Sequence, residues 1–206
     1  MNVVKVKVCG ITNESDAIDA ISFGADALGF IFFSKSPRCI CSEKAAKISQ
    51  NIPPFIGKVG LFVNQKREEI FKCIDKVGLN VLQFHGDESQ DFCDSFKVPW
   101  IKTIPVDDKV DINERISRYD KASAILFDRL DQNARGGTGR SFDWNLLPSS
   151  LSMPFIVAGG LKPDNVGGLL NTVVPYAVDV CSGVEKEKGR KDKQKLRQFI
   201  EEVKER

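Results

Sequence analysis

The sequence alternates short apolar runs with amphipathic stretches along its whole length. The apolar runs are rich in Val, Ile and Phe and are bounded by Gly, Pro, Asn or Asp, which is typical of strands. They cover residues 3–9, 25–33, 56–63, 80–85, 100–106, 123–128, 154–159 and 177–183. The expected helices follow them, at residues 13–24, 42–51, 65–78, 87–96, 111–120, 142–147, 162–171 and 191–204. Eight strand–helix units are the number found in a (β/α)8 barrel, so we predict this α/β fold.

A Rossmann sheet also alternates strands and helices, but its first strand leads into a G-x-G-x-x-G turn. Here the first run is followed by Gly10 alone. The 206 residues contain no linker and no low-complexity segment, and a chain of this length can form one α/β barrel. We therefore expect residues 1–206 to form a single (β/α)8-barrel domain.

Charge and hydropathy limit the classes of partner. The net charge is +2, which gives no broad basic field, so we expect no nucleic-acid partner. No apolar run reaches the roughly 18 residues that a membrane span needs, so we expect no membrane association. Lysines interrupt the first apolar run, which is not the layout of a signal peptide, and we expect a cytoplasmic protein.

The cysteines indicate thiols rather than a disulfide framework or a metal centre. There are six, and none forms a C-x-x-C pair. The single histidine, His85, leaves few nitrogen ligands for zinc, and we expect no metal. A thiol or metal-binding protein built on Cys39-x-Cys41 is the alternative from a different functional class. Cys73 and Cys93 fall in helical patterns and are expected to be structural.

Polar residues collect where the predicted strands end. They are Cys9, Gln83, His85, Asp128 and Asp179. The carboxyl ends of barrel strands meet at one rim, where active sites are built, so these residues are candidates for a shared site. Each also has a structural interpretation: a strand-terminal Asp is a common turn former, and a cysteine at a strand end is often a small buried hydrophobe.

Two strand-to-helix connections, residues 33–42 and 129–141, are longer than usual, and long loops tend to carry function. The first holds Arg38, whose guanidinium suits a carboxylate or simply faces solvent. The second has a glycine-rich hinge that closes over a ligand or merely connects two elements. That hinge consists of Gly136, Gly137, Thr138 and Gly139.

Glycines follow the last two predicted strands, at Gly159 and Gly160 and at Gly183, beside Ser182. Such loops leave backbone N–H groups open to an anion, and in a barrel the loops after strands seven and eight often bind phosphate. Plain turns are the alternative interpretation. Because two such loops occur at the expected strands, we favour a phosphate site.

Seven motifs in chain order resemble the phosphoribosylanthranilate isomerase family of tryptophan biosynthesis. They are KVCGIT (7–12), SPR (36–38), LQFHGDE (82–88), LFD (126–128), GGTGRSFDW (136–144), AGGLKPDNV (158–166) and DVCSGVE (179–185). The resemblance implies a barrel, no cofactor, and an Amadori rearrangement of N-(5-phosphoribosyl)anthranilate to 1-(2-carboxyphenylamino)-1-deoxyribulose 5-phosphate. It also implies Cys9 as general base, Asp128 as general acid and Arg38 on the anthranilate carboxylate. Cys181 stands where the family usually has Ser.

The chemistry of this reaction agrees with those roles. An acid must protonate the ribose ring oxygen, and a base must then remove the C2′ proton of the resulting Schiff-base cation. A thiolate can be that base if a nearby cation lowers its pKa. Lys7 shares a strand face with Cys9 and is one candidate for that cation. Its alternative role is a structural ion pair with Asp179 on the neighbouring strand.

The nearest alternative enzyme is the histidine-pathway isomerase, which performs the same rearrangement on a similar barrel. That family has an Asp at the end of the first strand, whereas this chain has Cys9. Its substrate also carries two phosphates, and only one glycine-built anion site is evident here. We expect phosphoribosylanthranilate as the small-molecule substrate, and we favour a monomer over a dimer.

Overall fold

The computed structural model describes residues 3–106, 111–129, 142–148 and 151–206. Eight parallel strands close into a barrel in chain order, with β1 paired to both β2 and β8. The strands are β1 (Lys5–Cys9), β2 (Ala27–Ile31), β3 (Gly57–Phe62), β4 (Val81–Phe84), β5 (Trp100–Val106), β6 (Ala124–Arg129), β7 (Phe155–Val157) and β8 (Ala177–Val180). The predicted (β/α)8 barrel is therefore confirmed.

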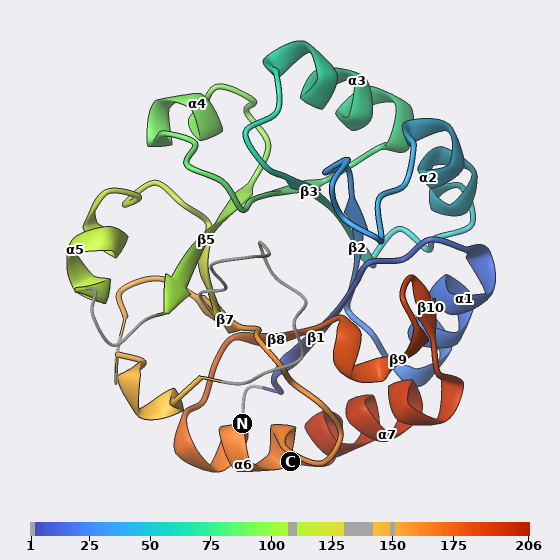
Figure 1. The fold of residues 1–206 in the computed structure, drawn as a ribbon, viewed down its shortest axis with the longest axis vertical. Coiled ribbons are helices and arrows are strands. Elements are labelled where there is room, and N and C mark those ends of the chain that lie inside the picture. The colour runs from blue at the N-terminus through green and yellow to red at the C-terminus, as the bar shows by residue number, and fades with distance from the viewer. Residues whose placement is uncertain (1–2, 107–110, 130–141, 149–150) are drawn as a thin grey trace.

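Helices form the outer ring of the molecule (Figure 1). They are α1 (Glu14–Phe23), α2 (Ser42–Ser49), α3 (Arg67–Val77), α4 (Gln90–Asp94), α5 (Ile112–Ser117), α6 (Val166–Thr172) and α7 (Lys193–Lys204). Two short 3-10 turns, η1 (Trp144–Leu146) and η2 (Ser182–Val184), complete the ring and the mouth. None of the described helices is long and apolar enough to cross a membrane.

Two local predictions were wrong, and one element was not predicted. The expected helix at 142–147 is only the 3-10 turn η1, and the eighth strand ends at Val180 instead of continuing to residue 183. Between β8 and α7 the chain also forms an unexpected antiparallel hairpin, β9 (Glu185–Glu187) and β10 (Arg190–Lys191). Charged residues fill this segment, so its sequence lacks the apolar alternation that signals a strand.

The first helix shows how local chemistry sets the boundaries of an element. The side chain of Asn13 accepts a hydrogen bond from the backbone N–H of Asp16, which caps the amino end of α1. Gly24 ends the helix with φ of 106°, a left-handed conformation that glycine adopts without strain. Both signals are visible in the sequence, and α1 lies within the predicted range.

The alternation along the strands divides the interior into two layers. Val6 and Val8 face outward and pack in the large core between strands and helices. Lys7 and Cys9 take the opposite face and point into the barrel, as the two-residue period of a strand requires. The lower barrel interior is filled by Ile101, Ala124, Leu126, Ile156, Ala158 and Ala177. This packing closes the barrel below the mouth.

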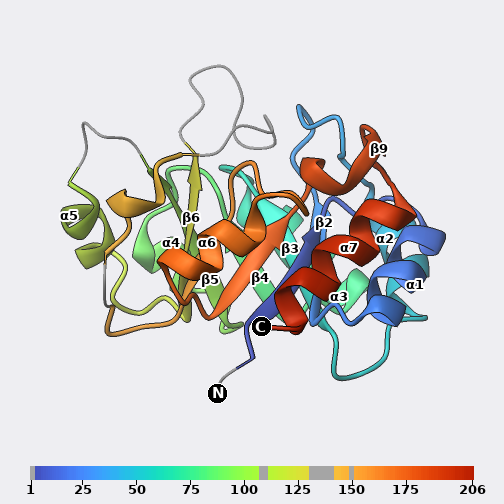
Figure 2. The ribbon, with the colours of Figure 1, turned by 90° about the horizontal axis from the view of Figure 1, so that it is seen from below.

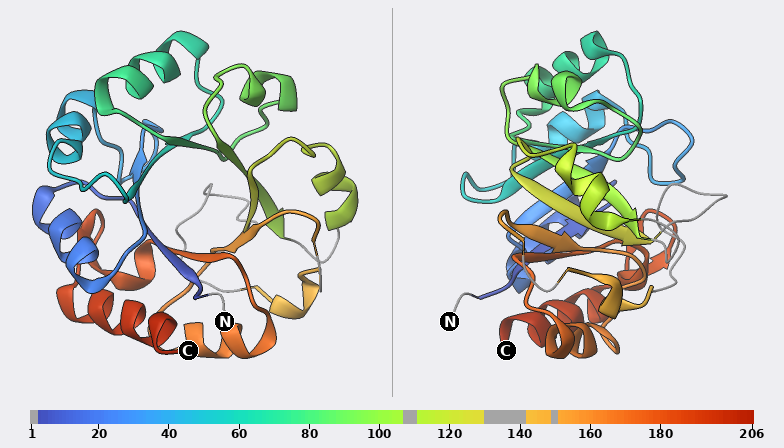
Figure 3. Two further views of the ribbon diagram at one scale, coloured as in Figure 1. Left: turned by 180° about the vertical axis from the view of Figure 1, so that it is seen from behind. Right: turned by 90° about the vertical axis from the view of Figure 1, so that its left-hand side faces the viewer.

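The carboxyl ends of the strands define the mouth. The long connection after β2 and the β9–β10 hairpin rise at this end, opposite the carboxyl terminus (Figure 2). Views from behind and from the side show the same arrangement (Figure 3). The hairpin, β1 and β8 therefore all contribute to one side of the mouth.

Candidate active site

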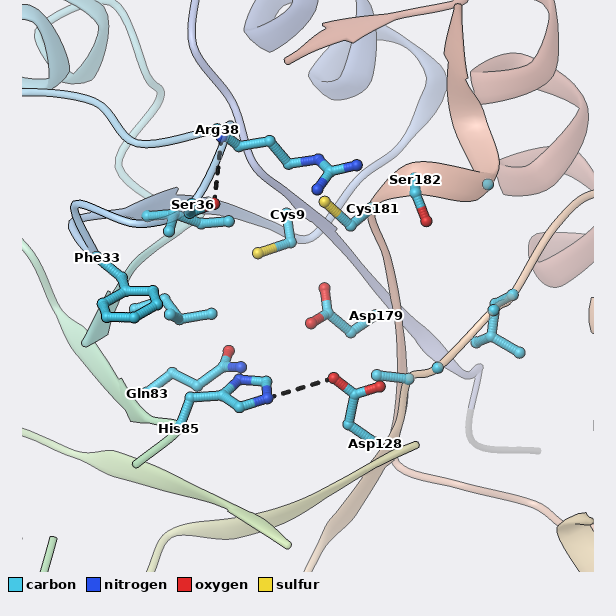
Figure 4. Close-up of a pocket in the computed structure, with 17 residues that line it drawn as sticks. Cys9, Phe33, Ser36, Arg38, Gln83, His85, Asp128, Asp179, Cys181 and Ser182 are labelled. Carbon is cyan, nitrogen blue, oxygen red and sulfur yellow. Dashed lines mark hydrogen bonds and ion pairs between the residues drawn. The ribbon is translucent and has the colours of Figure 1, made fainter. Parts of the chain in front are cut away.

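A pocket of about 660 Å³, part of it open to solvent, occupies the mouth of the barrel. Ten of the predicted site residues line it: Cys9, Arg38, Gln83, His85, Asp128, Gly159, Gly160, Asp179, Ser182 and Gly183. The side chains of Cys9, His85, Asp128 and Asp179 point into it from the ends of β1, β4, β6 and β8, and Arg38 reaches in from the connection after β2 (Figure 4). The four predicted hinge residues Gly136, Gly137, Thr138 and Gly139 lie outside the described residues. The structure thus brings together every predicted site residue that it describes.

Cys9, the last residue of β1, and Cys181, directly after the end of the neighbouring strand β8, both line the pocket. The hydrogen bond that Cys9 makes to Cys181, together with burial, raises the pKa of Cys9 well above its ordinary value. The same hydrogen bond lowers the pKa of Cys181 to about 7, against the effect of burial and with help from the charges of Lys191 and Arg38. The sequence points to Cys9 as the activated thiol, whereas in the resting structure the negative charge is favoured on Cys181.

Lys7 forms an ion pair with Asp179 beneath the two thiols. Its Nζ lies 2.7 Å from Asp179 Oδ2, and both side chains are buried. Burial alone lowers the pKa of Lys7, but the charges of Asp179 and Cys9 outweigh it and raise that pKa. Burial raises the pKa of Asp179 to about 7, although Lys7 opposes the shift. The structural ion pair considered for Lys7 is therefore present. The positive charge of Lys7 also favours a thiolate on Cys9.

Asp128 lies across the pocket from Cys9 (Figure 4). His85 Nε2 is 3.3 Å from Asp128 Oδ2, and the backbone N–H of Arg129 donates to Asp128 Oδ1 over 2.8 Å. Gly159 packs against this carboxyl with φ of 80°, and a Cβ there would stand 3.0 Å from Asp128 Oδ1 and 2.9 Å from the Arg129 nitrogen. A side chain at residue 159 would push the carboxyl out of place.

Three polar atoms in the pocket wall are buried without a hydrogen-bond partner among the described residues. They are Gln83 Oε1, His85 Nδ1 and Asp179 Oδ1. A buried polar atom without a partner costs about 1–3 kcal/mol, so such atoms require an explanation. All three belong to residues that line one cavity, and ligand hydroxyl groups placed there would satisfy them.

Arg38 comes from the long connection after β2 and is buried, contrary to the solvent-facing alternative. Glu185 at the start of β9 holds it in a bidentate pair: Arg38 Nε donates to Oε1 over 2.8 Å and Nη2 to Oε2 over 2.7 Å. Burial alone would raise the pKa of Glu185, but the hydrogen bonds from Arg38 and the charge of Lys191 lower it. Arg38 Nη1 makes no hydrogen bond to the described residues, so one edge of the guanidinium is left for a ligand.

The loops after β7 and β8 pack directly against each other. Gly159 and Gly160 have φ of 80° and 69°, in the region that glycine favours. A Cβ on Gly183 would come within 1.8 Å of the carbonyl oxygen of Leu161, so only glycine permits this contact. Asn165 Nδ2 donates to the carbonyl of Gly160 over 3.0 Å and fixes the first loop. The result is a side-chain-free surface suited to an anion.

Sequence reasoning missed three residues that support this site: Glu185, Lys191 and Asn165. Asn165 lies in the AGGLKPDNV motif, but the motif by itself gives no role for this side chain. Glu185 ends the DVCSGVE motif and Lys191 lies in the charged segment after it, and no local pattern indicates that either side chain turns towards the pocket. The described residues contain no group of three or more His, Cys, Asp or Glu side chains that could hold a metal ion.

Comparisons with known proteins agree on one family. The family model described as N-(5′-phosphoribosyl)anthranilate (PRA) isomerase matches residues 6–202. An N-(5′-phosphoribosyl)anthranilate isomerase from Pseudomonas fluorescens strain SBW25 is 47% identical over 98% of this chain and 97% of its own length.

Two solved structures are also similar. The phosphoribosyl anthranilate isomerase of Thermotoga maritima has a TM-score of 0.91 and 40% identity, covering 98% of this chain and 100% of its own. Another such isomerase, solved with reduced 1-(o-carboxyphenylamino)-1-deoxyribulose 5-phosphate, has a TM-score of 0.84 and 37% identity over 98% and 100% of the two chains.

Proposed function

This chain belongs to the N-(5′-phosphoribosyl)anthranilate isomerase family, enzymes of tryptophan biosynthesis, and from that premise we propose how its own residues perform the rearrangement. The substrate is phosphoribosylanthranilate, and the product is 1-(2-carboxyphenylamino)-1-deoxyribulose 5-phosphate. One observation carries the proposal: Cys9 and Asp128 lie on opposite sides of one pocket whose wall keeps three polar atoms unpaired. A sugar between them would have an acid on one face and a base on the other.

The substrate has two ends that the pocket distinguishes. We assign the phosphate to the backbone N–H groups around Gly160, Ser182 and Gly183, the surface that side chains leave open. We assign the anthranilate carboxylate to the free edge of Arg38, because an arginine already fixed by Glu185 presents that edge without losing further side-chain entropy. Phe33, Ile31 and Leu61 form an apolar wall beside it for the aromatic ring.

Ring opening is the first chemical step. Asp128 donates a proton to the ribose ring oxygen, the C1′–O bond breaks, and the nitrogen lone pair forms a Schiff-base cation at C1′. His85, 3.3 Å from the carboxyl, fixes the orientation of Asp128. Gln83 and Asp179 accept hydrogen bonds from the ribose hydroxyl groups through their unpaired oxygens.

Proton abstraction follows. The cation at C1′ acidifies the C2′–H bond, Cys9 takes the proton, and the electrons of that bond form an enolamine that tautomerises to the ketone. Cys9 becomes a thiolate when its own proton passes to Cys181 through their hydrogen bond. The two sulfurs therefore share one proton, and Lys7, Lys191 and Arg38 stabilise the single negative charge. The whole scheme uses only side chains of this chain.

The eight strands close one barrel in chain order, which supports the proposal that the protein is one barrel domain. That it works as a monomer stays a prediction. The cytoplasmic location stays a prediction.

The proposal is tested by following the loss of substrate fluorescence as phosphoribosylanthranilate is consumed. Asp128→Asn and Cys9→Ser should each lower kcat by about 10²–10⁴-fold, because each removes a general acid or base. The exposed Asp94 and Cys39 give matched controls: Asp94→Asn and Cys39→Ser should turn over normally. Full activity of either pocket variant would remove its residue from the mechanism.

A further inference from the structure

Cys9 and Cys181 are placed as a pair that can be joined. The parallel register of β1 and β8 matches Val8 with Val180; Cys9 is the next and last residue of β1, and Cys181 directly follows the end of β8. Lys191 Nζ donates to the backbone carbonyl oxygens of both cysteines, which places the two residues side by side. Neighbouring strands are spaced about 4.8 Å apart, within the roughly 4.4–6.8 Å between Cα atoms that a disulfide spans. Both side chains line the same pocket.

A buried cation stands beside this pair. Lys191, on β10, donates from Nζ to the carbonyl oxygens of Cys9 over 2.7 Å and of Cys181 over 3.0 Å, and lies 3.9 Å from the Cys181 sulfur. Arg38 adds a second positive charge on the same side. Such surroundings favour a thiolate, which is the form that attacks peroxides. The thiolate on Cys181 also faces the pocket, so small molecules can reach it.

The other thiols lack this combination. Burial raises the pKa of Cys73 to about 11 and that of Cys93 to about 12. Cys39 is exposed, and desolvation also raises its pKa. Among the six cysteines, all of which the structure describes, Cys181 combines a lowered pKa, access from a pocket and a second thiol lining the same pocket, which are the three features of a peroxide-sensitive cysteine with a resolving partner.

We propose that a hydroperoxide oxidises Cys181 and that Cys9 then closes a reversible disulfide with it, which switches the isomerase off. The disulfide itself depends only on the geometry of the pair. The loss of activity rests on the proposed function, because it requires Cys9 to be the general base. The substrate of the isomerase is neither oxidised nor reduced in this process.

The steps balance. The Cys181 thiolate attacks the terminal oxygen of the hydroperoxide, an S–O bond forms, the O–O bond breaks, and the alkoxide leaves and takes a proton. The Cys9 sulfur then attacks the sulfenic sulfur, the S–O bond breaks, and water leaves with the proton of Cys9. The two sulfurs together lose two electrons, which reduce the hydroperoxide to an alcohol and water.

The test uses the full chain, reduced and then freed of reductant, with hydrogen peroxide at neutral pH. Remaining thiols are blocked, and the protein is digested with trypsin, which releases Cys9 and Cys181 on separate peptides without a second cysteine. We expect a cross-linked peptide between the two, loss of activity that follows its yield, and recovery of both with dithiothreitol. In Cys181→Ser the activity is expressed as a fraction of that variant's own activity before treatment. Its reversible loss of activity should be at least about tenfold slower than in the unaltered chain. Cys39→Ser should behave as the unaltered chain.

The possible results distinguish a failure of the disulfide inference from a failure of Cys9 as the general base. Absence of the Cys9–Cys181 peptide, or reversible inactivation that is unchanged in Cys181→Ser, overturns the inference. A cross-link that forms in full while turnover persists supports the disulfide and refutes Cys9 as the base. The peptide map of the unaltered chain decides the point even if a variant folds poorly.

Discussion

Among the buried lysine–carboxylate pairs of the described residues, two invite comparison, one at the mouth of the barrel and one behind its wall. The mouth pair is Lys7 with Asp179, whose Nζ–Oδ2 distance is 2.7 Å. The wall pair is Lys102 on β5 with Glu88 in the connection after β4, whose Nζ–Oε2 distance is 2.9 Å. In both pairs each side chain is less than a tenth exposed, so burial alone does not distinguish them.

Hydrogen bonding does distinguish them. In the wall pair both carboxylate oxygens are used: Glu88 Oε1 accepts from the backbone N–H of Asn64 and Oε2 from that of Gly86, while Lys102 also donates to the Gly86 carbonyl. These bonds fix the loop that follows His85. In the mouth pair Asp179 Oδ1 has no partner among the described residues. The saturated pair maintains structure, and the incomplete pair is open to a ligand.

Breaking the wall pair should produce the largest effect on stability. Lys102→Met leaves the Glu88 carboxylate buried without its counter-ion, which costs about 3–5 kcal/mol of the free energy of unfolding. Urea unfolding followed by circular dichroism measures it. The exposed pair of Lys121 and Asp94 provides the control, since Lys121→Met should change stability by less than about 1 kcal/mol. Equal effects of the two variants would contradict a structural role for the wall pair.

Breaking the mouth pair should instead affect catalysis. Asp179→Asn keeps the shape but removes a charged acceptor for the ribose, a loss of about 1.5–3 kcal/mol of binding or transition-state energy. This corresponds to a decrease of about 10- to 150-fold in kcat/KM. Steady-state kinetics measures it, with the matching change Glu88→Gln assayed on its folded fraction. If Glu88→Gln lowered kcat/KM as much as Asp179→Asn, the contrast between the pairs would fail.

The smallest effect is a pH dependence of stability that belongs to the mouth pair. Burial raises the pKa of Asp179 to about 7, above its unfolded value, so the folded state binds the proton more tightly. This contribution is present below about pH 4 and is lost as pH rises through about 7. Subtracting the unfolding free energies of Asp179→Asn from those of the unaltered chain isolates it. A difference that grows with pH would have the wrong sign.

The sequence predicts that Lys7 and Asp179 lie together inside the barrel, but it does not predict the pairing of Arg38. The alternation of Val6, Lys7 and Val8 places the lysine inside the barrel, and the barrel rule brings Asp179 beside it. Both follow from local periodicity and strand order. The pairing of Arg38 with Glu185 joins residues 147 positions apart through an unpredicted hairpin, so no local pattern reports it.

The distribution of charge between the thiols was also beyond sequence reasoning. Lys7 alone suggests that Cys9 is the lower-pKa thiol. In the structure Lys7 is neutralised by Asp179, while Lys191 folds back on β10 towards Cys181. A pKa depends on every nearby group in space, and here the deciding cation is distant in the chain from Cys9.

The division of labour between Asp128 and Cys9 is the central claim, and a kinetic isotope effect tests it most directly. Substrate deuterated at C2′ slows only the step in which the base removes that proton. In Cys9→Ser we predict an isotope effect on kcat well above one, because proton removal becomes rate-limiting. In Asp128→Asn we predict an effect near one, because ring opening limits the rate. The reverse pattern, with a large effect in Asp128→Asn and none in Cys9→Ser, would contradict the account.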